Sequence, residues 1–258
     1  MSKQRIKRLQ KQLNLDADGI IGPATLSAFE NAVLGKQKSS QETSLYSLTL
    51  SKKGFQQIIE HEISSPEYYR LRLQKPTWPG GASGITIGIG YDLGYHRASQ
   101  IRKDWSPYVS DKELQQLVSV ASKKGEVAKK ARSKLNNIRI PYDAAATVFS
   151  ESTLPRYAKG TRKIYYGIDK LLPDAQAALL SLVYNRGTRL SGSKRKEMKA
   201  IQALVKKQQY NQIANQLISM KRLWENTNLA GLLKRRDDEA NLIRHASKRY
   251  AWKELVRV

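Results

Sequence analysis

The segment Asp174–Asn185 is apolar around nearly its whole circumference and contains the run AQAALLSLVY. A helix that is hydrophobic on every side is buried by its neighbours. Gly187 follows it at a position where helix ends favour glycine. Most of the chain after Leu48 has helical periodicity, and further helices are expected over residues 54–63, 199–220 and 229–245, with a capping box at Ser110–Glu113.

One segment, GITIGIGYDLG (residues 84–94), interrupts this pattern because its apolar side chains alternate with Thr86, Gly88, Gly90 and Asp92. Such alternation is typical of strands with one face in the core. Gly88 and Gly90 would leave room for a chain-like ligand, although a glycine-rich hairpin would look the same. We therefore predict an α+β fold that is predominantly helical, with a small β-hairpin.

Thr86 and Asp92 can share a site only if this segment turns between them. Fully extended, they would lie about 20 Å apart, at roughly 3.3 Å per residue. Gly88 and Gly90 make such a turn feasible.

Glu62 lies on the apolar face of the helix expected over residues 54–63. Phe55, Ile58 and Ile59 define that face, and Glu62 follows Phe55 by seven residues. A carboxyl group there is costly to leave ionised, so its pKa is expected to rise, as a general acid near neutral pH requires. A glutamate paired with an arginine is the alternative interpretation.

Two carboxylates in contrasting environments are the minimum for glycoside hydrolysis. Glu62 suits the protonation of the leaving oxygen, and Asp92 suits the activation of water or the stabilisation of the developing cation. A separation of roughly 6.5–9.5 Å would indicate inversion and about 5–5.5 Å retention. Both outcomes are open at this point.

The first 35 residues have a pattern of their own, with apolar residues at helical spacing on either side of an Asp-Gly turn. The polar, non-periodic stretch GKQKSSQETS that follows suits a flexible tether. We therefore predict a small module over 1–35, a linker over 36–47 and a large domain over 48–258.

The chain carries a net charge of +24, and the large domain holds most of it. Residues 1–35 hold five basic and three acidic residues, and the remainder holds 41 and 19. Such a field favours binding to a polyanion. Nucleic acid is not expected, because the basic residues are dispersed and RNA- and DNA-binding motifs are absent.

The residue composition also limits which cofactors the protein could bind and where in the cell it is made. The chain has no cysteine, and its three histidines show no metal-ligand spacing, so we expect neither a metal nor a cofactor. The basic start, MSKQRIKRLQKQLNL, lacks the apolar run of a signal peptide. No run of 18 apolar residues occurs. We expect synthesis in the cytoplasm and, for an extracytoplasmic target, release by another agent.

The stretch Ile6–Val33 resembles the three-helix peptidoglycan-binding modules through its LQ pair, its DG-I-x-GPxT turn and its closing AF helix. The resemblance implies a ligand groove near the DG turn. The matching positions are Asp18, Gly19, Gly22, Pro23 and Thr25. Turn geometry would explain Gly22 and Pro23 equally well.

Residues from about 48 to 245 resemble the phage-type lysozymes, within the branch typified by the bacteriocin pesticin. Three stretches in the family's order carry the resemblance. The first is a helix ending in Glu62, which precedes Thr86-Ile87-Gly88-Ile89-Gly90 by 24 residues. The second is the helix end Tyr184-Asn185-Arg186-Gly187. The third is the last helix, Gly231–Ala240 (GLLKRRDDEA).

The resemblance implies a catalytic triad of Glu62, Thr86 and Asp92, with Thr86 positioning the attacking water. Common phage lysozymes place the catalytic aspartate six residues before the threonine, and this chain has Gly80 at that position. The pesticin-like branch places the aspartate six residues after the threonine, which corresponds to Asp92. Substrate contacts are expected from Gly88, Gly90, Tyr91 and Asn185. Asn185 could equally be a helix cap, and Arg235 and Arg236 are expected to be structural.

These features together predict a monomeric, endolysin-like N-acetylmuramidase. It would cleave the β-1,4 bond between N-acetylmuramic acid and N-acetylglucosamine in periplasmic or extracellular peptidoglycan. Its partners would be glycan strands and, through the basic surface, anionic cell-envelope polymers. The alternatives are a lytic transglycosylase on the same fold, which needs only the glutamate, and a catalytically inactive basic wall-binding protein.

Overall fold

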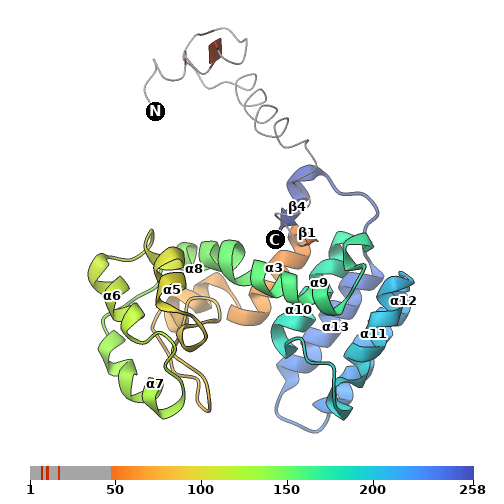
Figure 1. Ribbon diagram of the computed structural model, residues 1–258. Coiled ribbons are helices and arrows are strands. Elements are labelled where there is room, and N and C mark those ends of the chain that lie inside the picture. The colour runs from red at the N-terminus through yellow and green to blue at the C-terminus, as the bar shows by residue number, and fades with distance from the viewer. Residues whose placement is uncertain (1–6, 8–9, 12–16, 18–47) are drawn as a thin grey trace. The chain divides into compact units, whose positions relative to one another are not determined.

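The computed structural model describes residues 48–258 together with Lys7, Gln10, Lys11 and Ala17 (Figure 1). The chain divides into two compact units, Met1–Tyr46 and Ser47–Val258. Apart from those four positions, the predicted module and linker lie outside the described residues and stay predictions. The same holds for the five predicted ligand residues of the module, which are Asp18, Gly19, Gly22, Pro23 and Thr25.

The second unit is mostly helical, as predicted. Its α-helices are α3 (Lys52–Ile63), α4 (Pro66–Tyr68), α5 (Ala98–Trp105), α6 (Asp111–Ser119), α7 (Gly125–Ala131), α8 (Tyr142–Val148), α9 (Leu154–Ile164), α10 (Pro173–Arg186), α11 (Lys196–Lys206), α12 (Tyr210–Ser219) and α13 (Ala230–Arg244). The π-helices are η2 (Tyr69–Leu73) and η5 (Phe149–Thr153). The short 3-10 helices are η3 (Leu93–Tyr95), η4 (Arg132–Leu135), η6 (Ile168–Lys170), η7 (Ser193–Arg195), η8 (Met220–Leu223) and η9 (Trp252–Glu254). The strands are β1 (Thr49–Ser51), β2 (Thr86–Ile87), β3 (Tyr91–Asp92) and β4 (Leu255–Arg257).

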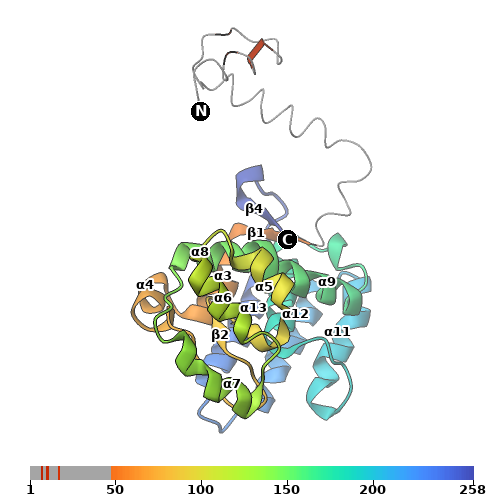
Figure 2. The same ribbon diagram turned by 60° about the vertical axis from the view of Figure 1, so that its left-hand side comes forward.

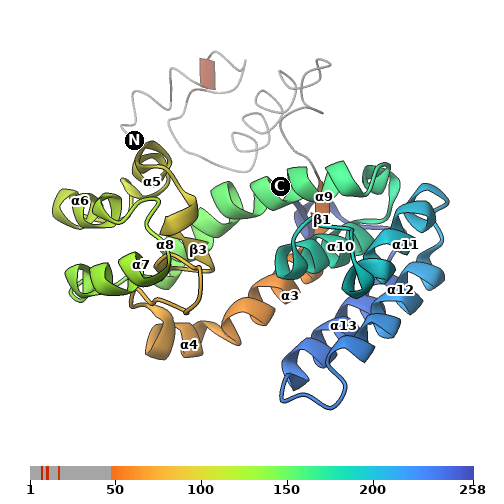
Figure 3. The same ribbon diagram turned by 60° about the horizontal axis from the view of Figure 1, so that its bottom comes forward.

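The helices of this unit form two groups. Figure 3 shows α5, α6 and α7 on one side and α10 to α13 on the other. The helical stretch α8–η5–α9 runs from one group to the other, and α3 lies between them. Figure 2, turned so that the first group comes forward, shows α5 and α6 in front of α3. The hairpin of β2 and β3 lies on the side of the first group.

Helix α10 is the centre of the second group, and its burial was predicted. Every residue from Asp174 to Val183 is buried. It contacts α3, α9, α13 and β1. Gly54 allows α3 to approach it closely, because a Cβ atom at that position would lie 2.4 Å from the Cβ of Ala177. Gly187 ends the helix at φ +72, so the predicted glycine stop is confirmed.

Two local predictions had different outcomes. The capping box at Ser110–Glu113 is present at the start of α6. The single helix predicted over residues 199–220 was wrong, because the chain forms α11 and α12 with a turn between them at Gln208, where φ is +51. Buried Ile201, Val205, Ile213 and Leu217 continue the apolar pattern across that turn and so conceal it.

The ends of this unit are joined by a strand pair that the sequence did not predict. β1 and β4 pair antiparallel, with Thr49 opposite Arg257. Leu48 and Val258 exchange two backbone hydrogen bonds of 2.9 and 3.0 Å. Three-residue strands are too short to show an alternating pattern. Among the helices in the described part of the chain, none is long and apolar enough to cross a membrane.

Candidate active site

The hairpin brings Thr86 and Asp92 directly opposite each other. β2 and β3 pair antiparallel, and their register sets Thr86 against Asp92. Opposed residues project to the same face of a sheet with Cβ atoms about 4.5–5.5 Å apart. Gly88 and Gly90 form the turn with φ values of +56 and +66, which favour glycine. The turn that the shared site requires is therefore present.

The other face of the hairpin belongs to the core, as the alternation predicted. Its five apolar residues are at most 2% exposed: Ile85, Ile87, Ile89, Tyr91 and Leu93. This corrects the assignment of Tyr91 to substrate binding. Its hydroxyl donates to Asp104 at 2.7 Å, and its ring stacks on His96 at 4.0 Å. Since its alternation with Asp92 directs Tyr91 into the core, the ring cannot reach a substrate.

Gly88 and Gly90 do not leave the open space that was expected for a ligand. A Cβ atom at Gly90 would lie 2.2 Å from the hydroxyl oxygen of Tyr184. At Gly88 it would lie 3.0 Å from Trp105 and 3.3 Å from Ala145. Glycine is needed here for the turn and for close packing, because neighbouring side chains already fill the space.

Asp92 is half-buried, and both of its carboxylate oxygens accept backbone hydrogen bonds. Gly84 N–H donates to Oδ2 at 3.0 Å and Gly94 N–H donates to Oδ1 at 2.8 Å. A Cβ atom at Gly84 would lie 2.2 Å from Oδ1, so only glycine permits this approach. Asp92 therefore fastens the base of the hairpin, whatever chemistry it performs.

Glu62 lies in the last turn of α3 and forms an ion pair. Arg235 Nη1 donates to Glu62 Oε1 at 2.6 Å. The Glu62 side chain is 21% exposed, so it lies within reach of water. The arginine-paired alternative is thus what the structure has. Oε2 accepts no hydrogen bond from the described residues.

A buried charge cluster holds Arg235 in place. Its guanidinium donates to Ser181 O and Oγ at 3.1 Å and lies 3.4 Å from Glu239. Glu239 also accepts from Arg236 at 2.7 Å and from Ser181 at 2.6 Å. Burial raises the pKa of Glu239, and the two arginines oppose this rise. Arg235 and Arg236 are 4% and 0% exposed, so both lie buried in this cluster.

Tyr157, on α9, lies near both candidate carboxylates. Burial raises the pKa of its hydroxyl, the negative charges of Glu62 and Asp92 raise it further, and Arg156 lowers it. A charge must be close to act in this way. The charges of Glu62 and Asp92 therefore both influence the pKa of this hydroxyl. Tyr157 is 37% exposed, and its ring lies 4.5 Å from that of Tyr184.

Sequence reasoning missed Tyr157 and Arg156. Arg156 lies over the ring of Tyr91 at 5.5 Å. Both are isolated residues on an ordinary helix, with no spacing that distinguishes them. Tyr184 could have been found, because it begins the Tyr184–Gly187 helix end. Asn185 beside it is exposed, and its place in a substrate groove stays a prediction.

His61 precedes Glu62 and lies 3.5 Å from Asp238. Burial and the charge of Arg235 lower the pKa of His61 to about 4. The ring is therefore uncharged near neutral pH, and this contact is then no ion pair. Across the described residues, no group of three or more potential ligands is placed to hold a metal ion.

Comparison with known proteins gives a family. Residues 60–236, more than half of the chain, match a family model described as a domain of unknown function (DUF8812). The match spans Glu62, the hairpin, Tyr157 and Arg235, so it includes each side chain placed at the candidate site. No curated protein matches the chain.

Proposed function

The chain belongs to this family of unknown function (DUF8812), and from its candidate site we propose that it is a peptidoglycan hydrolase. The proposed reaction is that of an N-acetylmuramidase, which cleaves the β-1,4 bond between N-acetylmuramic acid and N-acetylglucosamine. The substrate class comes from the sequence resemblances, and the reaction class comes from the two carboxylates.

One observation carries the proposal. The chain presents two half-buried carboxylates on separate elements, Glu62 in the last turn of α3 and Asp92 on the hairpin opposite Thr86. One is held by a side chain and the other by backbone amides, so their environments differ. Two carboxylates in contrasting environments are what glycoside hydrolysis requires.

The contacts suggest how the roles divide. Arg235 fixes Glu62 through Oε1, which leaves Oε2 as the atom to protonate the glycosidic oxygen as the bond to the anomeric carbon breaks. Thr86, opposite Asp92, would orient the water that attacks that carbon. Asp92 would take up the proton that this water releases, or stabilise the developing positive charge. The acid role requires Oε2 to carry a proton in the substrate complex.

The rest of the chain supports a polymeric substrate. The peptidoglycan-binding module predicted over 1–35 would raise the effective concentration of the domain at the wall. The net charge of +24 would add attraction to anionic envelope polymers.

A lytic transglycosylase is the second candidate, and the contacts of Asp92 favour it. Both carboxylate oxygens already accept backbone N–H groups, so Asp92 has less capacity to bind a water. A transglycosylase needs only the glutamate. Its substrate's own 6-hydroxyl attacks the anomeric carbon and leaves a 1,6-anhydro end in place of a reducing end.

Clearing of purified peptidoglycan, followed by analysis of the released sugars, tests both candidates. Wild type should clear the suspension and Glu62→Gln should not. Glu60→Gln is the matched control, because Glu60 is an exposed residue on the same helix. Reducing ends support the muramidase, and 1,6-anhydro ends support the transglycosylase. Equal clearing by wild type and Glu62→Gln would contradict both candidates, and no clearing by wild type would leave only the inactive wall-binding alternative.

A further inference from the structure

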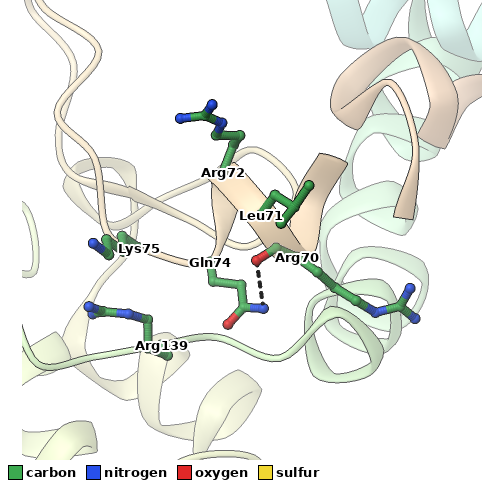
Figure 4. Close-up of a pocket in the computed structure, with 6 residues that line it drawn as sticks. All are labelled: Arg70, Leu71, Arg72, Gln74, Lys75 and Arg139. Carbon is green, nitrogen blue, oxygen red and sulfur yellow. Dashed lines mark hydrogen bonds between the residues drawn. The ribbon is translucent and has the colours of Figure 1, made fainter. Parts of the chain in front are cut away.

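A surface pocket rich in cations lies at the end of the helical stretch α4–η2. Figure 4 shows the six residues that line it: Arg70, Leu71, Arg72, Gln74, Lys75 and Arg139. Four of the six are cations and none is a carboxylate. The pocket shares no residue with the candidate active site.

Backbone contacts fix the geometry of this pocket. Gln74 O accepts from Ile140 N–H at 3.0 Å, and the Tyr69 hydroxyl donates to Ile140 O at 3.1 Å. These bonds hold the segment before Ile140 against the helix end. Arg139 is held in turn, because its Nη1 donates to the backbone oxygens of Asn136 and Ile138 at 2.7 and 2.8 Å.

The positive charges of the pocket are poorly balanced by the protein. Arg70 has a carboxylate neighbour, Glu67, but at 3.8 Å, with both side chains more than half exposed. Such a surface pair contributes little. Arg72 and Lys75 form no side-chain hydrogen bond or ion pair with any described residue. An anion in the pocket would therefore meet two cations, Arg72 and Lys75, that no carboxylate of the described residues neutralises.

An apolar side chain lies among these charges. Leu71 is 80% exposed, between Arg70 and Arg72, and also lines the pocket. Tyr68, three residues earlier, is 47% exposed, and residues three apart lie on neighbouring positions of a helix surface. A soluble anion would bind the cations but would offer no apolar surface for Leu71 to contact. Cations beside an exposed leucine and tyrosine fit the interface of a lipid bilayer.

We propose that residues 68–75 and Arg139 form a docking surface for an anionic phospholipid bilayer. The headgroup phosphate would occupy the cationic pocket, and Leu71 would enter the boundary of the acyl chains. Tyr68 would lie at the headgroup level. The proposal is independent of the glycosidase proposal, because it uses other residues.

Sedimentation of the full-length protein with vesicles tests the charge component. The vesicles hold phosphatidylglycerol and phosphatidylcholine in equal parts, in about 0.1 M salt. Loss of each cation at the surface should weaken binding about fivefold, so the double variant Arg72→Ser with Lys75→Ser should lose over tenfold. The control Lys199→Ser with Lys206→Ser removes the same charge from exposed positions on α11 and should change binding much less, because screening acts over about 10 Å. Equal losses from both pairs would overturn the proposal.

Leu71→Ser tests the lipid component. Binding to the anionic vesicles should weaken on the order of tenfold, and binding to soluble polyphosphate should stay unchanged. Val127→Ser is the control, since Val127 is also exposed, on α7. If Leu71→Ser binds vesicles like wild type, the pocket is a site for soluble phosphate anions and the bilayer proposal is wrong. Thermal unfolding of each variant confirms that these exposed substitutions leave the fold intact.

Discussion

The end of α3 and the hairpin each present one candidate carboxylate, but they hold it in opposite ways. Glu62 is held through one oxygen by a side chain, Arg235, which belongs to a separate buried cluster. Asp92 is held through both oxygens by the backbone amides of Gly84 and Gly94. A substitution at Glu62 therefore removes chemistry with little change to local structure. A substitution at Asp92 removes part of the hairpin as well.

This difference teaches that loss of activity has a different meaning at the two positions. At Glu62, lost activity with unchanged stability would identify a reacting group. At Asp92 the same loss could come from a disordered hairpin. Stability must therefore be measured beside activity at both positions.

The largest expected effect is on activity in Glu62→Gln. A positioned general acid contributes about 10²–10⁴-fold, so the initial rate of peptidoglycan clearing should fall by that factor. The midpoint of urea unfolding should change little, because Arg235 keeps its bonds to Ser181. A large fall in stability with Glu62→Gln would mean that Glu62, like Asp92, also holds local structure, and the difference between the two carboxylates would be lost.

The next effect concerns the buried cluster that fixes Arg235. Glu239→Gln leaves Arg235 and Arg236 without their shared buried counter-charge. Breaking such a group by removing one partner costs about 3–5 kcal/mol of unfolding free energy. Urea unfolding at pH 7 measures this, with the exposed Glu225→Gln as control. A loss below about 1 kcal/mol would mean that the cluster does not anchor Arg235 through charge.

A smaller effect is expected for Asp92→Asn. The side-chain nitrogen of asparagine cannot accept a hydrogen bond, so the backbone N–H of either Gly84 or Gly94 loses its acceptor. An unsatisfied group of this kind lowers the free energy of unfolding by about 1–3 kcal/mol. Urea unfolding should detect the loss, whereas exposed Asp111→Asn should show little. Activity measured where the variant is fully folded then separates the mechanisms. A hydrolase loses its activity there, and a transglycosylase retains it.

The smallest effect is a pH dependence from His61, the neighbour of Glu62. Its pKa is about 4 in the folded protein, below its value of about 6.5 in an unfolded chain. Between these values the unfolded state binds a proton that the folded state does not, so stability falls as the pH is lowered from 6.5 to 4. Relative to His61→Gln, wild type should lose on the order of 1–2 kcal/mol over this window.

Unfolding at pH 7 and pH 4.5 measures this difference. The same substitution at the exposed His245 serves as a control. If wild type and His61→Gln lose the same free energy of unfolding between pH 7 and pH 4.5, then His61 is protonated in the folded state as readily as in the unfolded state, and the prediction is wrong.

The parts of the fold that could be predicted have a periodic pattern over many residues. Helix α10 is one case, since ten consecutive buried residues leave no other interpretation. The hairpin is another, because five apolar residues alternate with small and polar ones. The pairing of β1 with β4 could not be predicted, since its three-residue strands lie at opposite ends of the domain.

The candidate site was predictable in part for the same reason. Glu62, Thr86 and Asp92 stand at fixed spacings that the sequence displays. Tyr157 and the partner of Glu62, Arg235, come from helices about 95 and 173 residues further along the chain, and only the packing of α9 and α13 brings them close. For Tyr91 two indications disagreed. The alternation of the hairpin residues indicated that its side chain is buried, whereas its place in the motif indicated contact with the substrate. The assignment to the substrate followed the motif and was wrong.

The bonds between Leu48 and Val258 close residues 48–258 into a loop of covalent chain and hydrogen bonds. A short peptide joining these positions would replace two hydrogen bonds with a covalent link and would add little strain. The chain could then be opened elsewhere, at the turn around Gln208, to give a circular permutant. In such a permutant the order of helices along the chain changes, while Glu62, Asp92 and Tyr157 keep their neighbours. Folding and catalysis could thus be studied with the connectivity of the domain as the variable.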